Sequence, residues 1–200
     1  MDIPAIAEIH QRAFRGAFLA RLGRGFLRRY YELVHEYDRG ILVVADGTSG
    51  VEGFAAGFLD PLEFYRRMRL NSRRFAVPLA LAVVRDPFLL GRIVYNARRV
   101  RRVPDANPGA CELSSIAVSP DKASRGLGKA LVGAFLRRAW DSGAEHVELT
   151  TDAERNESTN AFYRQLGFEA RSSFVQYGGR RMNEYVLPCP RTEAPARRVS

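Results

Sequence analysis

The chain has 200 residues, 46% of them hydrophobic and 26% charged, with a net charge of +9. These values are typical of a single globular domain with a buried core, and they exclude a largely disordered chain. The longest apolar run, residues 75–84, is shorter than the roughly 20 residues that cross a bilayer, and the N-terminus does not resemble a signal peptide.

The first sixty residues predict two helices and a hairpin. Residues 2–14 place isoleucines at helical spacing after an aspartate and a proline, which is the pattern of a helix start. Residues 18–38 predict a second helix that is broken or kinked near its two glycines. Residues 40–47 and 51–60 are apolar runs bounded by glycine, so we expect an antiparallel hairpin.

Residues 61–102 hold the whole of the basic excess. They contain eleven arginines and two acids, and the rest of the chain is neutral. Their pattern is helical, in about three pieces that we expect to be separated at Pro78 and at Asp86–Pro87. Residues 103–109 predict a loop, so the segment 61–109 forms a basic, largely helical insert.

The second half alternates strands and helices. We expect strands at residues 111–118 and 146–152 with a helix at 125–142 between them, which makes a βαβ unit with a right-handed crossover. This order indicates a mixed α/β sheet.

The end of the chain completes this sheet. A short helix follows the βαβ unit; Asn156 can cap its start and Gly167 can end it. Residues 168–179 and 180–188 read as two closing strands. We expect the tail, residues 189–200, to be disordered.

The turn between the strand and the helix of the βαβ unit is rich in glycine and basic residues. Gly126 and Gly128 lie where the first backbone N–H groups of the helix lack internal partners and the helix dipole is positive. Glycine lets a ligand approach the backbone closely, and Arg125 and Lys129 add positive charge. The arrangement suits a pyrophosphate; the alternative is a tight connection with packing glycines.

Three stretches together resemble the GNAT superfamily of acetyl-CoA-dependent N-acetyltransferases. SSIAVSP precedes the turn, and the glycines of the turn fit the family's pyrophosphate loop. NESTNAFYRQLGF fits the family's later motif at Asn156, Tyr163 and Gly167–Phe168. Ala123 departs from the family's Gln or Arg at the first loop position. The resemblance is strong over residues 111–170, weak over the first sixty residues, where the family's opening strand is not seen, and slight in the insert.

The resemblance implies a mostly antiparallel mixed sheet flanked by helices, with the insert between the hairpin and the central strand. It implies that strands 111–118 and 146–152 splay apart and that the pantetheine arm of acetyl-CoA lies in the gap. An unpaired amide near Ile116 or Ala117 would then polarise the thioester carbonyl. The residues expected to bind acetyl-CoA are Ile116, Ala117, Val118, Ser124, Arg125, Gly126, Leu127, Gly128, Lys129, Asn156 and Tyr163.

Acetyl transfer to an amine needs a base, because an alkyl ammonium with a pKa near ~10 is protonated at neutral pH. Glu112 is the first candidate: alternation along the strand places Glu112, Ser114 and Ile116 on one face, and related enzymes often carry a glutamate here. The alternative is an exposed or salt-bridged glutamate, with Glu148 and Asp152 in reserve.

Tyr163 matches the family's general acid toward the leaving thiolate. Tyrosine, near ~10, is less acidic than a thiol, near ~8.5, so a strong hydrogen bond can serve in place of full proton transfer. A tyrosine packed in the core beside Phe162 is the alternative.

We expect the other residues with reactive side chains, a cysteine and a histidine, to have structural rather than catalytic roles. Cys111 has no histidine beside it in sequence and reads as a buried structural thiol, and His146 as a surface residue at a strand end. Two cysteines are too few for a disulfide framework, so we expect reduced thiols and a cytoplasmic protein. We predict no metal site.

Three roles for the basic insert remain open. It can be a lid whose arginines receive an anionic acceptor such as an amino-sugar nucleotide. It can lie on a membrane surface with its arginines toward phosphates. It can form a homodimer whose arginines are solvated. We favour the lid, because long inserts often lie near active sites. We do not expect nucleic acid, since no recognition motif is present.

The sequence therefore predicts one domain over residues 1–188 that moves an acetyl group from acetyl-CoA directly to a primary amine of a small molecule. The alternative is a non-catalytic acyl-CoA-binding or membrane-surface module with the same fold. Peripheral membrane contact would come from residues 61–102.

Overall fold

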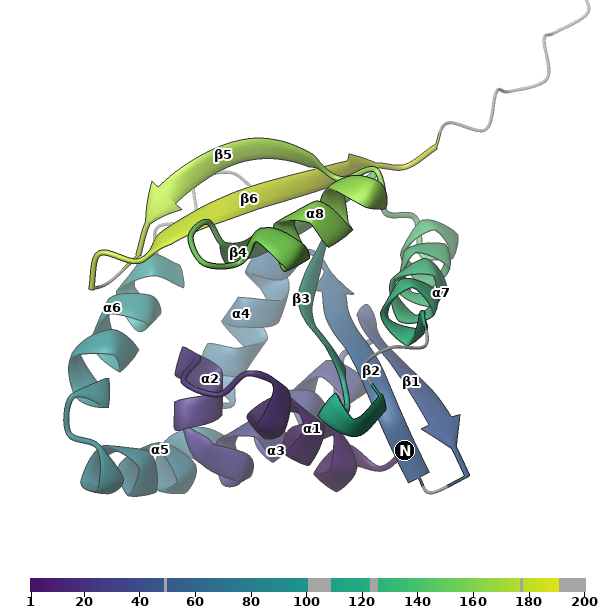
Figure 1. The fold of residues 1–200 in the computed structure, drawn as a ribbon. Helices are drawn as coiled ribbons and strands as arrows, with labels where there is room; N and C mark the ends of the chain where they lie inside the picture. The colour runs from purple at the N-terminus through teal and green to yellow at the C-terminus, as the bar shows by residue number, and fades with distance from the viewer. Residues whose placement is uncertain (49, 101–108, 123–125, 177, 191–200) are drawn as a thin grey trace, which may run out of the picture.

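The computed structural model describes residues 1–48, 50–100, 109–122, 126–176 and 178–190 (Figure 1). The helices are α1 (Ile3–Ala13), α2 (Phe18–Arg21), α3 (Gly23–Glu36), α4 (Pro61–Leu70), α5 (Arg73–Arg85), α6 (Leu89–Val100), α7 (Leu127–Asp141) and α8 (Glu157–Gln165), with a 3-10 turn at Pro120–Lys122. The strands are β1 (Gly40–Gly47), β2 (Gly50–Leu59), β3 (Ala110–Val118), β4 (His146–Asp152), β5 (Glu169–Val175) and β6 (Arg181–Pro188).

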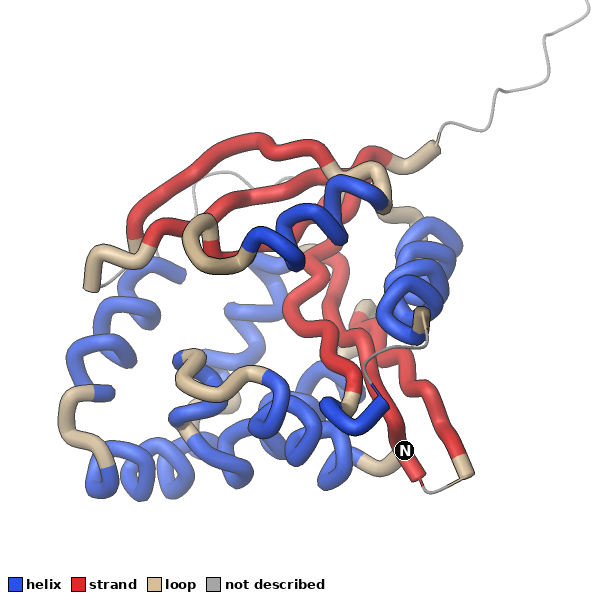
Figure 2. Tube along the Cα trace, viewed as in Figure 1, coloured by secondary structure: helices blue, strands red, loops and turns tan. Residues whose placement is uncertain are grey.

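The strands form one six-stranded sheet in the order β1-β2-β3-β4-β6-β5. Neighbouring strands are antiparallel except for β3 and β4. These two strands are parallel, and α7 connects them in the chain. The expected mixed, mostly antiparallel sheet flanked by helices is confirmed (Figure 2).

Two hydrophobic cores cover the two faces of the sheet. Alternation along β2 sends Phe54 and Phe58 into a core shared with α1, α3, α4 and α5, and sends Ala55 and Leu59 into a core shared with α7 and α8. The sheet is therefore buried on both sides.

The predicted helices and strands of the first sixty residues are confirmed. The break between α2 and α3 falls at Leu22. Gly23, which begins α3, has a φ of +85°, a backbone conformation that glycine adopts without strain. The short helix α8 ends at Gly167, as expected. The loop 103–108 and the tail 191–200 lie outside the described residues. None of the helices in the described ranges has the length and apolarity needed to cross a bilayer.

The insert is helical in three pieces, but one of the two predicted breaks is wrong. The break at Asp86–Pro87 is confirmed, whereas Pro78 lies inside α5 and the first break falls at residues 71–72. Proline removes one helical hydrogen bond, but Phe75 and Ala82, buried on either side of it, hold the helix against the core. Pro78 itself packs against Gly25 of α3.

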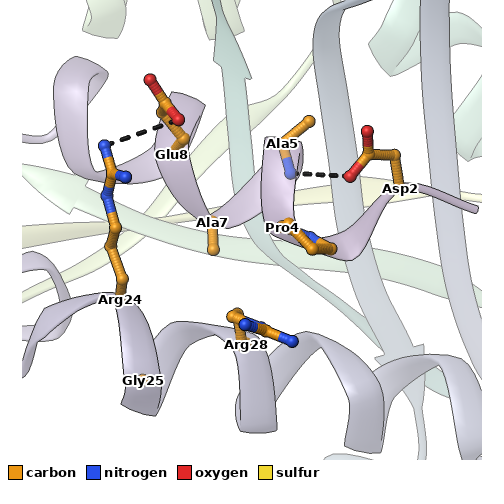
Figure 3. Close-up of a pocket in the computed structure, with 8 residues that line it drawn as sticks. All are labelled: Asp2, Pro4, Ala5, Ala7, Glu8, Arg24, Gly25 and Arg28. Carbon is orange, nitrogen blue, oxygen red and sulfur yellow. Dashed lines mark hydrogen bonds and ion pairs between the residues drawn. The ribbon is translucent and has the colours of Figure 1, made fainter.

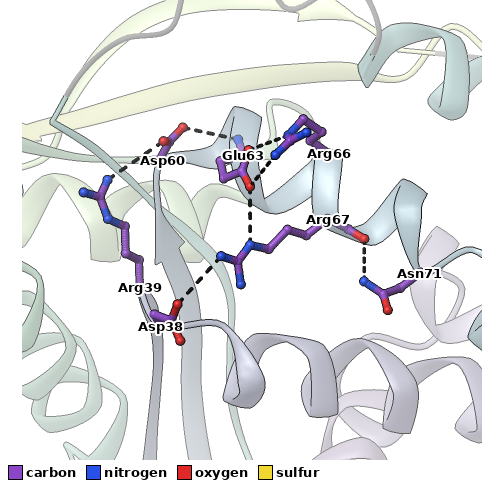
Figure 4. Close-up of polar contacts among 7 residues, drawn as sticks. All are labelled: Asp38, Arg39, Asp60, Glu63, Arg66, Arg67 and Asn71. Carbon is purple, nitrogen blue, oxygen red and sulfur yellow. Dashed lines mark hydrogen bonds and ion pairs between the residues drawn. The ribbon is translucent and has the colours of Figure 1, made fainter.

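The first helix of the insert is part of the domain. The ring of Phe64 stacks on that of Phe58 in β2, with 3.7 Å between centroids. Glu63 accepts hydrogen bonds from Arg66 and Arg67, and Arg67 also lies 3.7 Å from Asp38 at the end of α3 (Figure 4). α4 is thus fixed from both its apolar and its polar side.

A buried histidine makes the stability of this fold depend on pH. His10 of α1 lies with Nδ1 2.6 Å from the hydroxyl of Tyr31, and its Nε2 has no partner in the described part of the chain. Burial lowers the pKa of His10 from 6.5 to about 4. The unfolded chain takes up a proton near pH 6.5, so the stabilising contribution of neutral His10 is present above that pH and is lost as pH falls toward 4.

We therefore expect His10 to account for a loss of about 2 kcal/mol in the free energy of unfolding between roughly pH 7.5 and pH 5. Urea unfolding at the two pH values measures it. The His10→Phe variant should lose less stability on acidification by that amount, whatever its absolute stability. Equal losses in the two proteins would show that another group is responsible.

Candidate active site

The strands β3 and β4 pair only at their first three residues. Ala110 faces His146, Cys111 faces Val147 and Glu112 faces Glu148, and among the described residues no further pair follows. The predicted splay is confirmed: from Leu113 to Val118, β3 pairs with β2 alone. The backbone edge of β3 toward β4 is therefore open to an extended ligand.

The direction of the β3 amides follows from one hydrogen bond. The N–H of Ser119 donates to the carbonyl of Glu52 in β2, at 2.7 Å. Because N–H direction alternates along a strand, Ala117 also points to β2, whereas Ile116 and Val118 point into the gap. Of the two amides predicted to polarise a thioester, that of Ile116 has the suitable direction.

A β-bulge at Ser114 changes which side chains share a face. Gly57 and Ala56 of β2 face Leu113 and Ser115, so Ser114 is the extra residue. Before the bulge, Leu113 lies in the core under α7, while after it Ile116 takes that side. The prediction that Ile116 shares a face with Glu112 and Ser114 is therefore wrong, because strict alternation does not survive the extra residue.

The glycine turn is open. Gly126 caps the start of α7 with a φ of +69°. Among the described residues, no side chain caps the helix there, and a Cβ added to Gly126 would meet nothing within 4 Å. Gly128 follows in the first turn of α7, with Phe162 of α8 at 3.7 Å from a Cβ placed on it. The first N–H groups of this 15-residue helix thus have no side-chain cap in the part of the chain that the structure describes, which suits a pyrophosphate.

Four further residues were predicted near this turn, and the structure describes two of them. Lys129 is exposed, and Leu127 packs against the core under α7. Ser124 and Arg125 lie outside the described residues.

Tyr163 of α8 is held in a cluster of aromatic rings. Its centroid lies 5.4 Å from that of Phe162, 5.7 Å from Phe168 and 6.1 Å from Tyr185. Burial raises the pKa of Tyr163 to about 12. The phenol therefore stays protonated at neutral pH and can donate a hydrogen bond.

Asn156 does not cap α8 with its side chain, contrary to expectation. Its Nδ2 donates to Thr151 Oγ1 at 2.8 Å and to the carbonyl of Asp152 at 3.2 Å, so the side chain is tied back to β4. This leaves the start of α8 fixed to the end of β4 beside the gap.

Asn160, which was not among the predicted residues, joins three elements. Its Nδ2 donates to the carbonyls of Asp152 and Asn156, and its Oδ1 accepts from the hydroxyl of Tyr185 in β6 at 3.0 Å. A buried amide with this many partners fixes the helix that carries Tyr163. The signal in the sequence is a polar residue on the inward face of a helix.

Glu112 lies at the last paired position before the strands separate. Its Oε1 accepts a hydrogen bond from the hydroxyl of Tyr65 in α4, at 2.8 Å. The neighbouring hydroxyls of Tyr30 and Ser114 are 2.9 Å apart, and burial followed by the charge of Glu112 raises the pKa of Tyr30. The carboxylate is thus positioned on the face of the sheet that α3 and α4 cover.

The reserve acids are more constrained. Asp152 is bound through both carboxylate oxygens to Arg180. Burial raises the pKa of Glu148, which lies 3.4 Å from Arg171. Cys111 is fully buried and burial raises its pKa, so its reading as a structural thiol is supported. His146 is half-buried rather than on the surface, 3.9 Å from Glu148.

Two pockets in the described part of the chain could hold a small ligand. One of about 430 Å³ is set between α1 and α3, where Glu8 pairs with Arg24 across the opening (Figure 3). It borders none of the candidate site residues described above. The other, of about 330 Å³, is lined by Gly16, Arg92, Gly178 and Arg180, and Arg180 connects it to Asp152 at the end of β4.

These features have a counterpart among known proteins. The sequence profile of the Acetyltransferase (GNAT) family matches residues 3–168. The chain belongs to this family. Membership of the GNAT family confirms the predicted fold and acyltransferase class, and it confirms acetyl-CoA as the donor expected of this fold.

Curated relatives of this GNAT protein are named mycothiol acetyltransferase. The one from Paenarthrobacter aurescens is 35% identical over 98 residues, which cover 49% of this chain and 29% of that relative. The one from Saccharomonospora viridis is 42% identical over 66 residues, which cover 33% and 21% of the two chains. The chain spans less than a third of the length of either.

Solved structures agree in fold. The protein yncA from Salmonella typhimurium, solved with its cofactor acetyl-CoA, matches with a TM-score of 0.63 at 17% identity, over 97% of this chain and 92% of that one. Ribosomal-protein-alanine N-acetyltransferase from Brucella melitensis also gives 0.63, at 15% identity and 94% of both chains. At these identities the likeness concerns the fold alone.

Proposed function

We propose that this GNAT protein transfers the acetyl group of acetyl-CoA directly to a primary amine of a small molecule that carries an anionic group. The observation that carries the proposal is the separation of β3 from β4, the strands on either side of α7 in the chain. Glu112 lies on the face of the sheet that α3 and α4 cover, and Tyr163 lies in the core of the opposite face. The N–H groups of α7 would bind the pyrophosphate, and the edge of β3 would hold the pantetheine arm.

The chemistry divides between three groups. Glu112 takes a proton from the substrate ammonium, either directly or through water. The amine nitrogen bonds to the acetyl carbon, whose oxygen is stabilised by the Ile116 amide. As the carbon–sulfur bond breaks, the nitrogen, which is still protonated once too often for an amide, releases its second proton to water. The leaving thiolate accepts a hydrogen bond from the hydroxyl of Tyr163 until it takes up a proton and leaves as the thiol. Glu112 and Ile116 are four residues apart, at most about 13 Å along a strand, so transfer of the proton to Glu112 through water fits this spacing better than direct transfer.

The cavity of about 330 Å³ supports an anionic acceptor. Two arginines line it: Arg180, which pairs with Asp152, and Arg92 of α6, whose guanidinium lies over the ring of Phe18, 5.3 Å from its centroid. Guanidinium groups bind phosphate and carboxylate with two parallel hydrogen bonds. The insert would thus act as a lid that reaches the acceptor through α6. Relatives named for mycothiol are consistent with a small acceptor, and an amino-sugar nucleotide has the required amine and charge.

A thiol-release screen with acetyl-CoA tests the activity. The acceptors are amino-sugar nucleotides, amino acids, polyamines and peptides, and we expect turnover with an anionic amine. Acetyl-CoA binding without release of thiol for any amine would instead favour the non-catalytic acyl-CoA-binding module.

Arg92 gives a sharper prediction for the acceptor. Loss of one charge-assisted hydrogen bond costs about 1.5–3 kcal/mol, so Arg92→Gln should raise KM for the anionic acceptor by roughly ten- to a hundredfold with kcat little changed. With a cationic amine as acceptor, the same variant should have the KM and kcat of the parent. Arg137→Gln, at an exposed position of α7, is the matched control. Equal losses with both kinds of amine would contradict a role in selecting charge.

A further inference from the structure

The insert exposes most of the large apolar surface of the molecule. Of the nine large hydrophobic side chains exposed in the described part of the chain, seven lie between Leu70 and Val94. Phe88, in the turn between α5 and α6, is 87% exposed. Scattered apolar residues on a surface are ordinary, but a contiguous group indicates an interaction.

The exposed residues of α5 form one helical face. Ala76, Val77, Ala80, Leu81 and Val84 are all exposed and recur at helical spacing; with Phe88 they are called the apolar stripe. The opposite face of α5 carries the buried Phe75 and Ala82, which pack into the core.

The direction of the apolar stripe follows from this packing. The ring of Phe75 lies 5.2 Å from that of Phe26 in α3, so the apolar stripe faces away from the domain. Figure 1 shows α5 and α6 at the outer edge of the molecule, beyond α1 to α3 and away from α7. The apolar stripe is therefore accessible while the glycine turn stays open.

Positive charge surrounds the apolar stripe. Arg73 and Arg85 are exposed at the first and last positions of α5, and Arg69 is exposed on α4. Both acids of residues 61–102 are already paired, Glu63 with arginines of α4 and Asp86 with Arg21. We propose that the apolar stripe docks α5 onto an anionic lipid surface, with Val84 and Phe88 among the acyl chains and the flanking arginines at the phosphates.

The charge decides between the occupants of this surface. A second copy of the chain would bring its own arginines against those of the first, and this repulsion opposes pairing through the apolar stripe. α5 is about 20 Å long. Over this whole length, a bilayer rich in anionic lipid can bury the apolar side chains among its acyl chains and pair the arginines with its negative headgroups. The proposal does not depend on the proposed acetyl transfer.

Vesicle co-sedimentation of the full chain tests it. We expect binding to vesicles of phosphatidylcholine with phosphatidylglycerol, weaker binding as salt rises, and little binding to phosphatidylcholine alone. The double variant Val84→Ser with Phe88→Ser should bind at least about tenfold more weakly, because the buried apolar area is lost. Arg73→Gln should weaken binding by about fivefold.

Matched control variants distinguish docking through the apolar stripe from nonspecific binding to vesicles. Val175 on β5 is also exposed, at 60%, so Val175→Ser should bind vesicles like the parent. All variants should keep the parent's acetyl-CoA affinity, which shows that they fold. Binding that is absent at low salt, or that is unchanged in the double variant, would overturn the proposal. So would a dimer in sedimentation analysis that the double variant abolishes, since the apolar stripe would then be occupied by a second copy.

Discussion

The Tyr163→Phe variant should lose about a hundred- to a thousandfold in kcat while binding acetyl-CoA as tightly as the parent. The change removes only the hydroxyl that we place beside the leaving sulfur, and a positioned proton donor is worth about that factor. Steady-state kinetics with the acceptor found by the thiol-release screen measures kcat, and calorimetry with acetyl-CoA measures the affinity.

The raised pKa of Tyr163 determines what this hydroxyl does. A phenol with a pKa of about 12 gives up its proton to a thiolate less readily than one in water. Against a thiol near ~8.5 the transfer is uphill by about 5 kcal/mol, less whatever burial adds to the basicity of the thiolate. We therefore expect a hydrogen bond to the developing thiolate rather than an early proton transfer. In the parent, deprotonation of Tyr163 should cause no loss of kcat until the pH comes within about one unit of 12.

Tyr185→Phe is the control for Tyr163. It removes another buried hydroxyl from the same cluster of rings, one that donates to Asn160. We expect a loss of stability of about 1 kcal/mol and a change in kcat of only a few-fold. If the two variants lose kcat equally, the effect of Tyr163 is one of packing and the proposed role is wrong.

The parts of the site carried by short motifs could be predicted from the sequence. The turn at Gly126 and the helix that carries Tyr163 each require a particular local backbone conformation, and such conformations favour particular residue types. The parallel pairing of β3 and β4 followed from the helix between them.

The parts that depend on register could not be predicted. The bulge at Ser114 has no signature in residue type, yet it moves Ile116 to the opposite face from Glu112. Pro78 continues a helix because tertiary packing outweighs the local cost of the missing hydrogen bond. Tyr65 reaches Glu112 from α4, in a segment with no recognisable motif. Contacts between distant segments decided each of these outcomes.

Glu112→Gln should lower kcat/KM by about a hundred- to a thousandfold near neutral pH. Glutamine keeps the shape and can still accept the hydrogen bond of Tyr65, but it cannot take a proton from the substrate ammonium. The free amine becomes more abundant as pH rises toward the pKa of the ammonium, near ~10. The variant should therefore recover, gaining about tenfold in kcat/KM for each pH unit, whereas the parent should level off once its carboxylate is ionised.

Glu148→Gln separates this role from a general effect of negative charge. Glu148 faces Glu112 across the last strand pair and lies 3.4 Å from Arg171, so its replacement changes the local charge equally. We expect a loss of only a few-fold in kcat/KM and the parent's pH profile. If Glu148→Gln matches the loss of Glu112→Gln, or if Glu112→Gln stays equally impaired at all pH values, Glu112 is not the base. In that case its bond to Tyr65 serves to hold α4 against the sheet, and the substrate amine loses its proton to solvent before it binds.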